Sequence, residues 1–299
     1  MDQSVKAAAR PITGRGASTT GGATGSRRGT RWGDWWRSLI LGVLCLLMIA
    51  PLIMAVIISF KSPSQFNRVP FLPTWPLRWE NYGFALQIIS QFMLNSVIVS
   101  GATVIGVLLL GSLSAYSFAV IDFPGRALVF YAVLALAMVP SSLTLVPSFV
   151  LVVKLKLINT HWSLILPWIA GGQVMAILIL RAFFESLPGE LFDACRIDGA
   201  SDWQIYWLVA LPLTRSMLGV VGILNILGTW NSLIWPALTI TERRLYPLVP
   251  GLYSYMHQYY TSHGRVMAGL LLGSVPLLIL FIFTSRWFVQ GLTSGAIKA

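Results

Sequence analysis

Six stretches of the chain are long and apolar enough to cross a lipid bilayer, and this feature constrains the fold more than any other. A spanning helix needs about 20 predominantly apolar residues. Each stretch is interrupted only by Gly, Pro, Ser, Thr, Asn or Gln, with no charge well inside it. We therefore predict an all-α integral membrane protein with six transmembrane helices, at about 38–60, 92–120, 127–153, 163–184, 216–240 and 267–289.

Composition and charge support a membrane protein rather than a nucleic-acid-binding one. Only 10% of the residues are charged, whereas a soluble domain carries about 25%. The net charge of +11 comes in large part from the first 37 residues, which hold seven of the 21 Lys and Arg residues. We predict a disordered, basic tail at 1–31, a six-helix membrane domain at 32–299, contact with lipid and no nucleic-acid partner.

The distribution of Lys and Arg predicts the orientation in the membrane. If the N-terminus is cytoplasmic, the cytoplasmic segments hold 13 of these residues and the outer segments hold eight. Cytoplasmic segments are normally the richer in Lys and Arg. An even number of spans puts both termini on one side. We therefore expect a multi-pass chain with both termini in the cytoplasm.

The segment between spans four and five is acidic, although the chain otherwise avoids charge. Five of the ten acidic residues lie within 185–202. Two short helices are predicted there: the first follows Pro188 and carries Leu191, Ala194 and Cys195 on an apolar face. Gly199 is suited to end it in a left-handed conformation. Ser201 and Gln204 match a capping box that begins the second helix, which ends near Pro212.

This segment, residues 190–213, is called the elbow below. It could be an amphipathic linker on the membrane surface, but such linkers are normally basic, to match anionic lipid. An acidic elbow at the inner face is better suited to docking a soluble protein. Aromatic residues are also frequent in the outer loops at 61–91 and 241–265, where they fit either a membrane-interface belt or a contact surface.

The elbow with its two preceding residues, PGELFDACRIDGASDWQIYWLVALPL at 188–213, resembles the cytoplasmic EAA loop of ATP-binding-cassette (ABC) importer permeases of the bacterial inner membrane, and of maltose-type sugar permeases in particular. Asp193, Ala194 and Cys195 occupy the E-A-A places, Gly199 the glycine, and Leu211–Pro212 the closing pair. DFPGR at 122–126, WNSLIWP at 230–236 and GLTSGAIK at 291–298 also fit. Asp193 replaces Glu, Cys195 replaces Ala, and Ser216 follows Arg215 where the family often has proline.

The resemblance implies a type I importer permease fold with a cytoplasmic coupling helix in the loop 185–215. It implies that this chain is not an enzyme and binds no cofactor, because ATP and Mg²⁺ belong to a separate ATPase dimer. A second permease subunit and an extracytoplasmic sugar-binding protein would complete the importer. The coupling residues expected from the motif and its acidic neighbours are Glu190, Asp193, Ala194, Cys195, Asp198, Gly199, Ala200, Leu211 and Pro212.

Polar residues in span five are candidates for the substrate path. Asn225, Gly228, Thr229 and Ser232 recur at helical spacing on one stripe. The stripe suits either a pore lining for a sugar or a packing seam of small residues. Trp230 could stack on a sugar ring or anchor at the interface. The path candidates are Gln173, Asn225, Thr229, Trp230, Asn231 and Ser232.

Other functions are less consistent with the sequence. An ion-coupled carrier commonly has intramembrane acids or repeated halves, and neither is present in this chain. A membrane enzyme would need a catalytic group or a metal site, and no such constellation is found in the sequence. A glycerol-phosphate or other polyol permease remains the alternative, because it shares the signature and because Arg243, Arg244 and Arg265 suit an anion.

Overall fold

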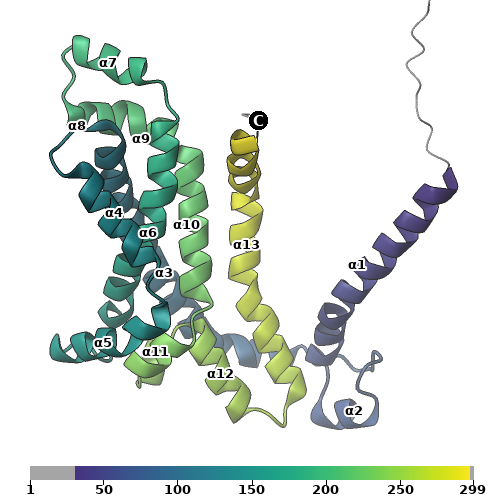
Figure 1. Cartoon of the computed structure of the whole chain (residues 1–299). Coiled ribbons are helices and arrows are strands. Elements are labelled where there is room, and N and C mark those ends of the chain that lie inside the picture. The colour runs from purple at the N-terminus through teal and green to yellow at the C-terminus, as the bar shows by residue number, and fades with distance from the viewer. Residues whose placement is uncertain (1–30, 297–299) are drawn as a thin grey trace, which may run out of the picture. The chain divides into compact units, whose positions relative to one another are not determined.

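The computed structural model describes residues 31–296, with side chains described for 35–284, and every regular element in that part of the chain is a helix (Figure 1). The fold-class prediction is thereby confirmed. The predicted tail at 1–31 lies outside the described residues, apart from Arg31, and so does the end of the GLTSGAIK motif. The residues up to Ala50 form one compact unit and those from Pro51 onward form a second, so each is described by itself.

The helices follow the predicted order, with additional short elements in the loops. They are α1 (Arg31–Ser59), α2 (Pro63–Arg68), α3 (Glu80–Val120), α4 (Arg126–Ala137), α5 (Ser141–Lys154), α6 (Trp162–Glu185), α7 (Gly189–Ile197), α8 (Asp202–Ile205), the π-helical turn η1 (Tyr206–Ala210), α9 (Leu211–Leu213), α10 (Arg215–Trp230), α11 (Ile234–Thr239), the 3₁₀ turn η2 (Arg243–Leu245), α12 (Leu248–Gln258) and α13 (His263–Ala296).

Within residues 31–296, four helices are long and apolar enough to cross a membrane, and two bent pairs raise the number of candidate spans to six. The single helices are Trp35–Ser59 of α1, then α3, α6 and the His263–Thr284 part of α13. One bent pair is α4 with α5, which meet at 99° near Pro140. The other joins Asp202–Leu213 to α10 at 75°.

Two of the predicted spans differ in detail from the observed helices. The stretch 216–240 is not one helix, because it breaks after Trp230 and resumes at Ile234 as the short α11. The stretch 127–153 is not one helix either, because it breaks near Pro140 into α4 and α5. In contrast, α6 continues through Pro167 without interruption.

Helix α3 is the central element of the unit from Pro51 onward, and it contacts α6, α10, α12 and α13. Its 41 residues span about 60 Å, about twice the thickness of a bilayer core. One buried cluster joins the C-terminal half of α3 to α6, α10 and the elbow, and another joins its N-terminal half to α12 and α13. The elbow therefore lies at one end of the helix group and α11 and α12 at the other (Figure 1).

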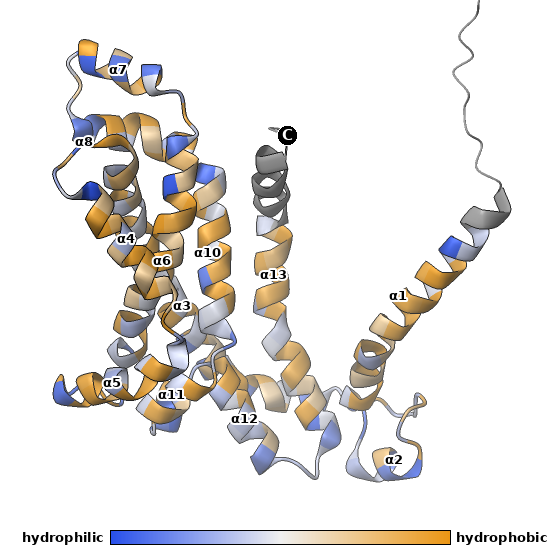
Figure 2. Ribbon diagram, viewed as in Figure 1, coloured by the Kyte–Doolittle hydropathy of each residue, from blue (hydrophilic) through white to orange (hydrophobic). Residues whose placement is uncertain are grey.

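Hydropathy follows this arrangement. Figure 2 shows hydrophilic residues on α7 and α8, while α6, α10 and α13 are largely apolar along the described part of their length.

At the end of the helix group opposite the elbow, the loop after α1 is held by Lys61, which is buried and donates hydrogen bonds from Nζ to the carbonyl oxygens of Val69 and Leu72 at 2.5 Å each. Burial lowers the pKa of Lys61 below its ordinary value.

Candidate functional site

The first arm of the elbow is α7, which is anchored by one side chain. Phe192 is buried in the cluster that contains Tyr116 of α3 and Phe184 of α6, and its ring centroid lies 6.4 Å from that of Tyr116. The predicted apolar face was incomplete: Leu191 and Cys195 are half-buried, but Ala194 is exposed. The helix therefore rests on Phe192, which the sequence reasoning missed.

The turn between the arms has the geometry predicted for Gly199. Its φ is +82°, in the left-handed region that favours glycine. The amide of Ala200 donates to the carbonyl of Cys195, and that of Gly199 donates to Arg196, both at 3.0 Å. These two bonds form a Schellman motif, which satisfies carbonyls at the end of α7. The turn is thus fixed by backbone hydrogen bonds and not by side-chain packing.

The second arm begins at the predicted capping box. The backbone N–H of Gln204 donates to Ser201 Oγ at 3.4 Å, and the backbone N–H of Ser201 donates to the side-chain Oε1 of Gln204 at 2.8 Å. The arm continues through α8, the π-helical turn η1 and α9, in which Leu211 and Pro212 are half-buried. Neither the π-helical turn nor its effect on side-chain direction was predicted.

The π-helical turn places Tyr206 against α3. Tyr206 is buried, and its hydroxyl lies 2.7 Å from Ser112 Oγ of α3. Tyr116, also on α3, donates from its hydroxyl to the backbone carbonyl of Asp202 at 3.3 Å. Two hydroxyl contacts and the aromatic cluster therefore connect the second arm to the central helix.

Arg196 connects the two arms through charge. Its guanidinium lies 3.3 Å from Asp193 on the first arm and 3.5 Å from Asp202 on the second, and it also donates to the carbonyl of Val120 at the end of α3. Exposed pairs of this kind each contribute about 0–1 kcal/mol. Their main effect is to orient the arms, because one cation has partners on three segments.

The exposed surface of the elbow combines carboxylates with large apolar side chains. Glu190, Asp193 and Asp198 are exposed, as are Ile197 at 86% and Trp203 at 58%. Ala200 at the turn is half-buried. Aromatic residues surrounded by polar groups are typical of protein interfaces. The surface is thus suited to a protein partner with basic groups around an apolar depression.

The polar stripe of α10 faces α3 in part. Thr229 is buried and donates to Ser100 Oγ of α3 at 2.9 Å, while the Asn225 amide nitrogen bonds to the carbonyl of Val221 in its own helix. Asn231 is exposed and Ser232 is half-buried. In this conformation Thr229 therefore belongs to a helix-packing seam.

The other path candidates lie at separate positions. Trp230 is buried in the cluster with Phe92 and Leu248, so its ring is covered in this conformation. Gln173 of α6 has both side-chain polar atoms buried without a hydrogen-bond partner, and its Oε1 would lie 3.3 Å from a Cβ placed on Gly111 of α3. An unpaired buried amide costs about 1–3 kcal/mol. Gln173 is therefore a buried polar group of α6 that a partner or substrate could satisfy.

Within the described residues, no group of three or more His, Cys, Asp or Glu side chains is arranged to hold a metal ion. The two cysteines, Cys45 and Cys195, are free.

Residues 107–294 match the family model described as binding-protein-dependent transport system inner membrane component. The chain is 32% identical over 272 residues to the arabinooligosaccharides transport system permease AraQ of Halalkalibacterium halodurans, with 89% of this chain and 96% of that protein covered. It is 33% identical to the diacetylchitobiose uptake system permease NgcG of Streptomyces coelicolor, with 84% and 85% covered.

A relative with a different named substrate is nearly as similar. The sn-glycerol-3-phosphate transport system permease UgpE of Yersinia pestis is 29% identical, with 86% of this chain and 94% of that protein covered. Among solved structures, a chain of a bacterial ABC transporter involved in the import of the acidic polysaccharide alginate superposes with a TM-score of 0.77. It is 21% identical, with 87% of this chain and 98% of that chain covered.

Proposed function

This chain belongs to the family of binding-protein-dependent transport system inner membrane components, and we propose that it forms half of the import path for an oligosaccharide. It is a multi-pass membrane subunit of an ABC importer and not an enzyme, because ATP hydrolysis is carried out by a separate subunit. The proposal adds that the elbow, residues 190–213, receives the movement of that ATPase subunit.

The observation that carries this proposal is the attachment of the elbow to α3. Phe192 of the first arm and Tyr206 of the second both enter the buried cluster that contains Tyr116. A force on the exposed carboxylates and on Ile197 would therefore reach the central helix through packed side chains. Packed interiors have low compressibility and transmit displacement rather than absorb it.

The energetic requirement on such a connection is large. Shifting a two-state protein from 1:99 to 99:1 takes about 5.5 kcal/mol of differential binding. A flexible hinge would lose this free energy in local motion. The Schellman motif at Gly199 and the capping box at Ser201 keep the angle between the arms fixed.

The remaining machinery is proposed by analogy with the family. A second permease subunit supplies the other half of the path, an ATPase dimer with ATP and Mg²⁺ docks on the elbow, and a sugar-binding protein delivers the substrate from outside. This requires both termini to be cytoplasmic, as the distribution of Lys and Arg indicates. We propose that the ATPase interface includes the carboxylates of Glu190, Asp193 and Asp198. Gly199 forms the turn of the elbow beside them.

The neutral character of the spans supports an uncharged substrate. The polar groups offered by α6, by α10 and by the break after α10 are the amides of Gln173 and Asn225 and the hydroxyl of Ser232, which suit a sugar. Two of the three arginines that would favour glycerol phosphate are otherwise engaged: Arg244 pairs with Glu242 at 2.6 Å, and Arg265 lies 4.1 Å over the ring of Phe84. An oligosaccharide is therefore the proposed substrate class.

The decisive experiment changes Gly199 and measures uptake and ATP hydrolysis in the reconstituted importer. No atom lies within 4 Å of a Cβ placed on Gly199, so Gly199→Val adds no collision and acts through the left-handed backbone alone. That strain is about 1–2 kcal/mol for an ordinary residue and more for a β-branched one. We expect the variant to insert in the membrane, to lose oligosaccharide uptake and to lose substrate-stimulated ATP hydrolysis.

Two controls separate this effect from general damage. Gly189→Val also meets open space, but it lies at the start of α7 without a positive φ, so uptake should remain close to that of the wild type. Gly199→Asn tolerates the left-handed conformation and should retain most of the uptake. Normal oligosaccharide uptake by Gly199→Val would show that the elbow does not couple the importer to ATP.

A further inference from the structure

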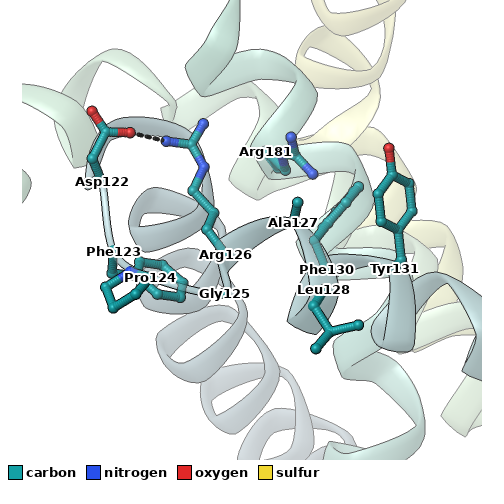
Figure 3. Close-up of a pocket in the computed structure, with 10 residues that line it drawn as sticks. All are labelled: Asp122, Phe123, Pro124, Gly125, Arg126, Ala127, Leu128, Phe130, Tyr131 and Arg181. Atoms are coloured by element: carbon teal, nitrogen blue, oxygen red, sulfur yellow. Dashed lines mark hydrogen bonds and ion pairs between the residues drawn. The ribbon is translucent and has the colours of Figure 1, made fainter.

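A cavity of 830 Å³ opens beside the turn that joins α3 to α4 (Figure 3). It is at the same end of the helix group as the elbow, since Arg196 of α7 contacts the carbonyl of Val120 at the end of α3. Gly125, with φ of +81°, reverses the chain so that α4 begins at Arg126. The cavity is lined by Asp122, Phe123, Pro124, Gly125, Arg126, Ala127, Leu128, Phe130, Tyr131 and Arg181.

Two guanidinium groups from different helices face this cavity. Arg126 comes from α4 and Arg181 from α6, and Figure 3 shows their charged ends on the same side of the cavity as the hydroxyl of Tyr131. The side chain of Leu128 extends toward the other side (Figure 3), whereas the ring of Phe130 lies against the Arg181 guanidinium. The cavity is therefore polar along one edge and apolar below it.

The arginines are only partly neutralised. Arg126 pairs with Asp122 at 2.7 Å, but the Asp122 side chain is 98% exposed, so the pair contributes little. Arg181 pairs with Glu185 at 2.7 Å, and its guanidinium carbon lies 3.5 Å from the centre of the Phe130 ring. Its third nitrogen, Nη1, is buried and has no hydrogen-bond partner among the residues that the structure describes. A buried donor of this kind costs free energy until an acceptor reaches it.

The surroundings of the cavity are those of a membrane surface. Helix α4 has no buried residue, and Leu128 is 76% exposed in a helix that is largely apolar after Arg126. Tyr131 is exposed as well, and tyrosines are enriched where hydrocarbon meets headgroups. A ligand there needs an anionic group for the arginines and a hydrocarbon part for Leu128 and Phe130. Basic pockets beside transmembrane helices bind the headgroups of anionic lipids.

We propose that this cavity binds an anionic phospholipid, with its phosphate between Arg126 and Arg181 and one acyl chain along Leu128 and Phe130. The lipid would occupy the leaflet on the side of the elbow, which is the inner leaflet in the proposed orientation. Only the choice of leaflet depends on the proposed function. Because Arg181 continues the helix that leads into the elbow, the bound lipid would fix the end of α6 beside it.

The test is a lipid titration of the purified importer in mild detergent, followed by native mass spectrometry. The probes are phosphatidylglycerol and phosphatidylcholine with the same acyl chains, and inorganic phosphate alone. We expect phosphatidylglycerol to bind more tightly than phosphatidylcholine, and inorganic phosphate not to compete at matched concentrations. Arg181→Gln and Arg126→Gln should each weaken phosphatidylglycerol binding about fivefold.

Further variants distinguish a built site from a general attraction of charge. Arg215→Gln removes an exposed arginine just after the elbow and should leave binding unchanged. Arg181→Lys keeps the charge and should recover part of the affinity. Leu128→Asn removes the exposed hydrocarbon contact and leaves the charge of the site unchanged. It should therefore weaken the binding of phosphatidylglycerol through the lost acyl-chain contact alone.

Three results would overturn the proposal. Equal losses of phosphatidylglycerol affinity in Arg181→Gln and Arg215→Gln would indicate non-specific attraction of the lipid to positive charge. If inorganic phosphate displaced phosphatidylglycerol and Leu128→Asn bound phosphatidylglycerol normally, the cavity would be a site for a free anion. Binding by the isolated chain that disappears in the assembled importer would show that a partner subunit covers the cavity. Size-exclusion profiles of the Arg181 and Leu128 variants identify any that are misfolded, and in that case Arg126→Gln decides the outcome.

Discussion

Removal of the Ser112 hydroxyl should destabilise the protein more than removal of the Tyr206 hydroxyl, although the two groups share one hydrogen bond. Ser112 has a single proton, which it donates to the carbonyl of Leu108 in its own helix. Tyr206 must therefore donate to Ser112 Oγ. Both side chains are buried, so the tyrosine hydroxyl has no water to replace a lost acceptor.

The two substitutions have different costs for this reason. Ser112→Ala leaves the Tyr206 hydroxyl buried without a partner, which costs about 1–3 kcal/mol. Tyr206→Phe removes the donor and leaves Ser112 bonded to Leu108, so only the net value of one hydrogen bond is lost, about 0.5–1.5 kcal/mol. The double variant leaves no unpaired group, and its stability should be close to that of Tyr206→Phe.

Thermal unfolding in detergent, followed by tryptophan fluorescence, measures this order. At about 2 °C per kcal/mol for a chain of this size, Ser112→Ala should lower Tm by about 2–6 °C and Tyr206→Phe by about 1–3 °C. Ser117→Ala is the matched control, because the Ser117 hydroxyl donates only to Leu113 in the same helix. Additive effects, with the double variant as unstable as the sum of the single ones, would refute the assigned donor and the unpaired hydroxyl.

Two further predictions concern the end of the helix group opposite the elbow. Gly264→Ala would place a Cβ against the backbone carbonyl oxygen of Lys61, so we expect fluorescence-detected size exclusion to show little folded protein. Gly83→Ala is the control, because a Cβ at Gly83 meets open space and the variant should fold normally. Burial lowers the pKa of His161 below its ordinary value of 6.5, so its contribution to stability is present above pH 6.5 and is lost as the pH falls below it. His161→Gln should reduce the fall in Tm between pH 7 and pH 5, whereas an unchanged pH dependence in that variant would contradict this assignment.

The sequence was sufficient for the local geometry of the elbow and insufficient for its attachment. Gly199 and the Ser201–Gln204 pair were predictable, because a left-handed turn and a capping box depend on a few neighbouring residues. The burial of Phe192 and Tyr206 was not, because the direction of each side chain depends on α3 and on the π-helical turn. Helical periodicity alone gave Ala194 a buried position that the structure does not give it.

The polar stripe of α10 shows why periodicity could not separate a path lining from a packing seam. Both require small polar side chains at the same spacing, and only the position of α3 places Thr229 against Ser100. The two interpretations are compatible when the helices move. A neutral hydroxyl pair contributes only about 0.5–1.5 kcal/mol, whereas breaking a buried ion pair so that one charge stays buried and unpaired costs about 3–5 kcal/mol. Because about 5.5 kcal/mol suffices to reverse a two-state equilibrium, a seam of hydroxyls and amides can open in each transport cycle and a seam of ion pairs would resist opening.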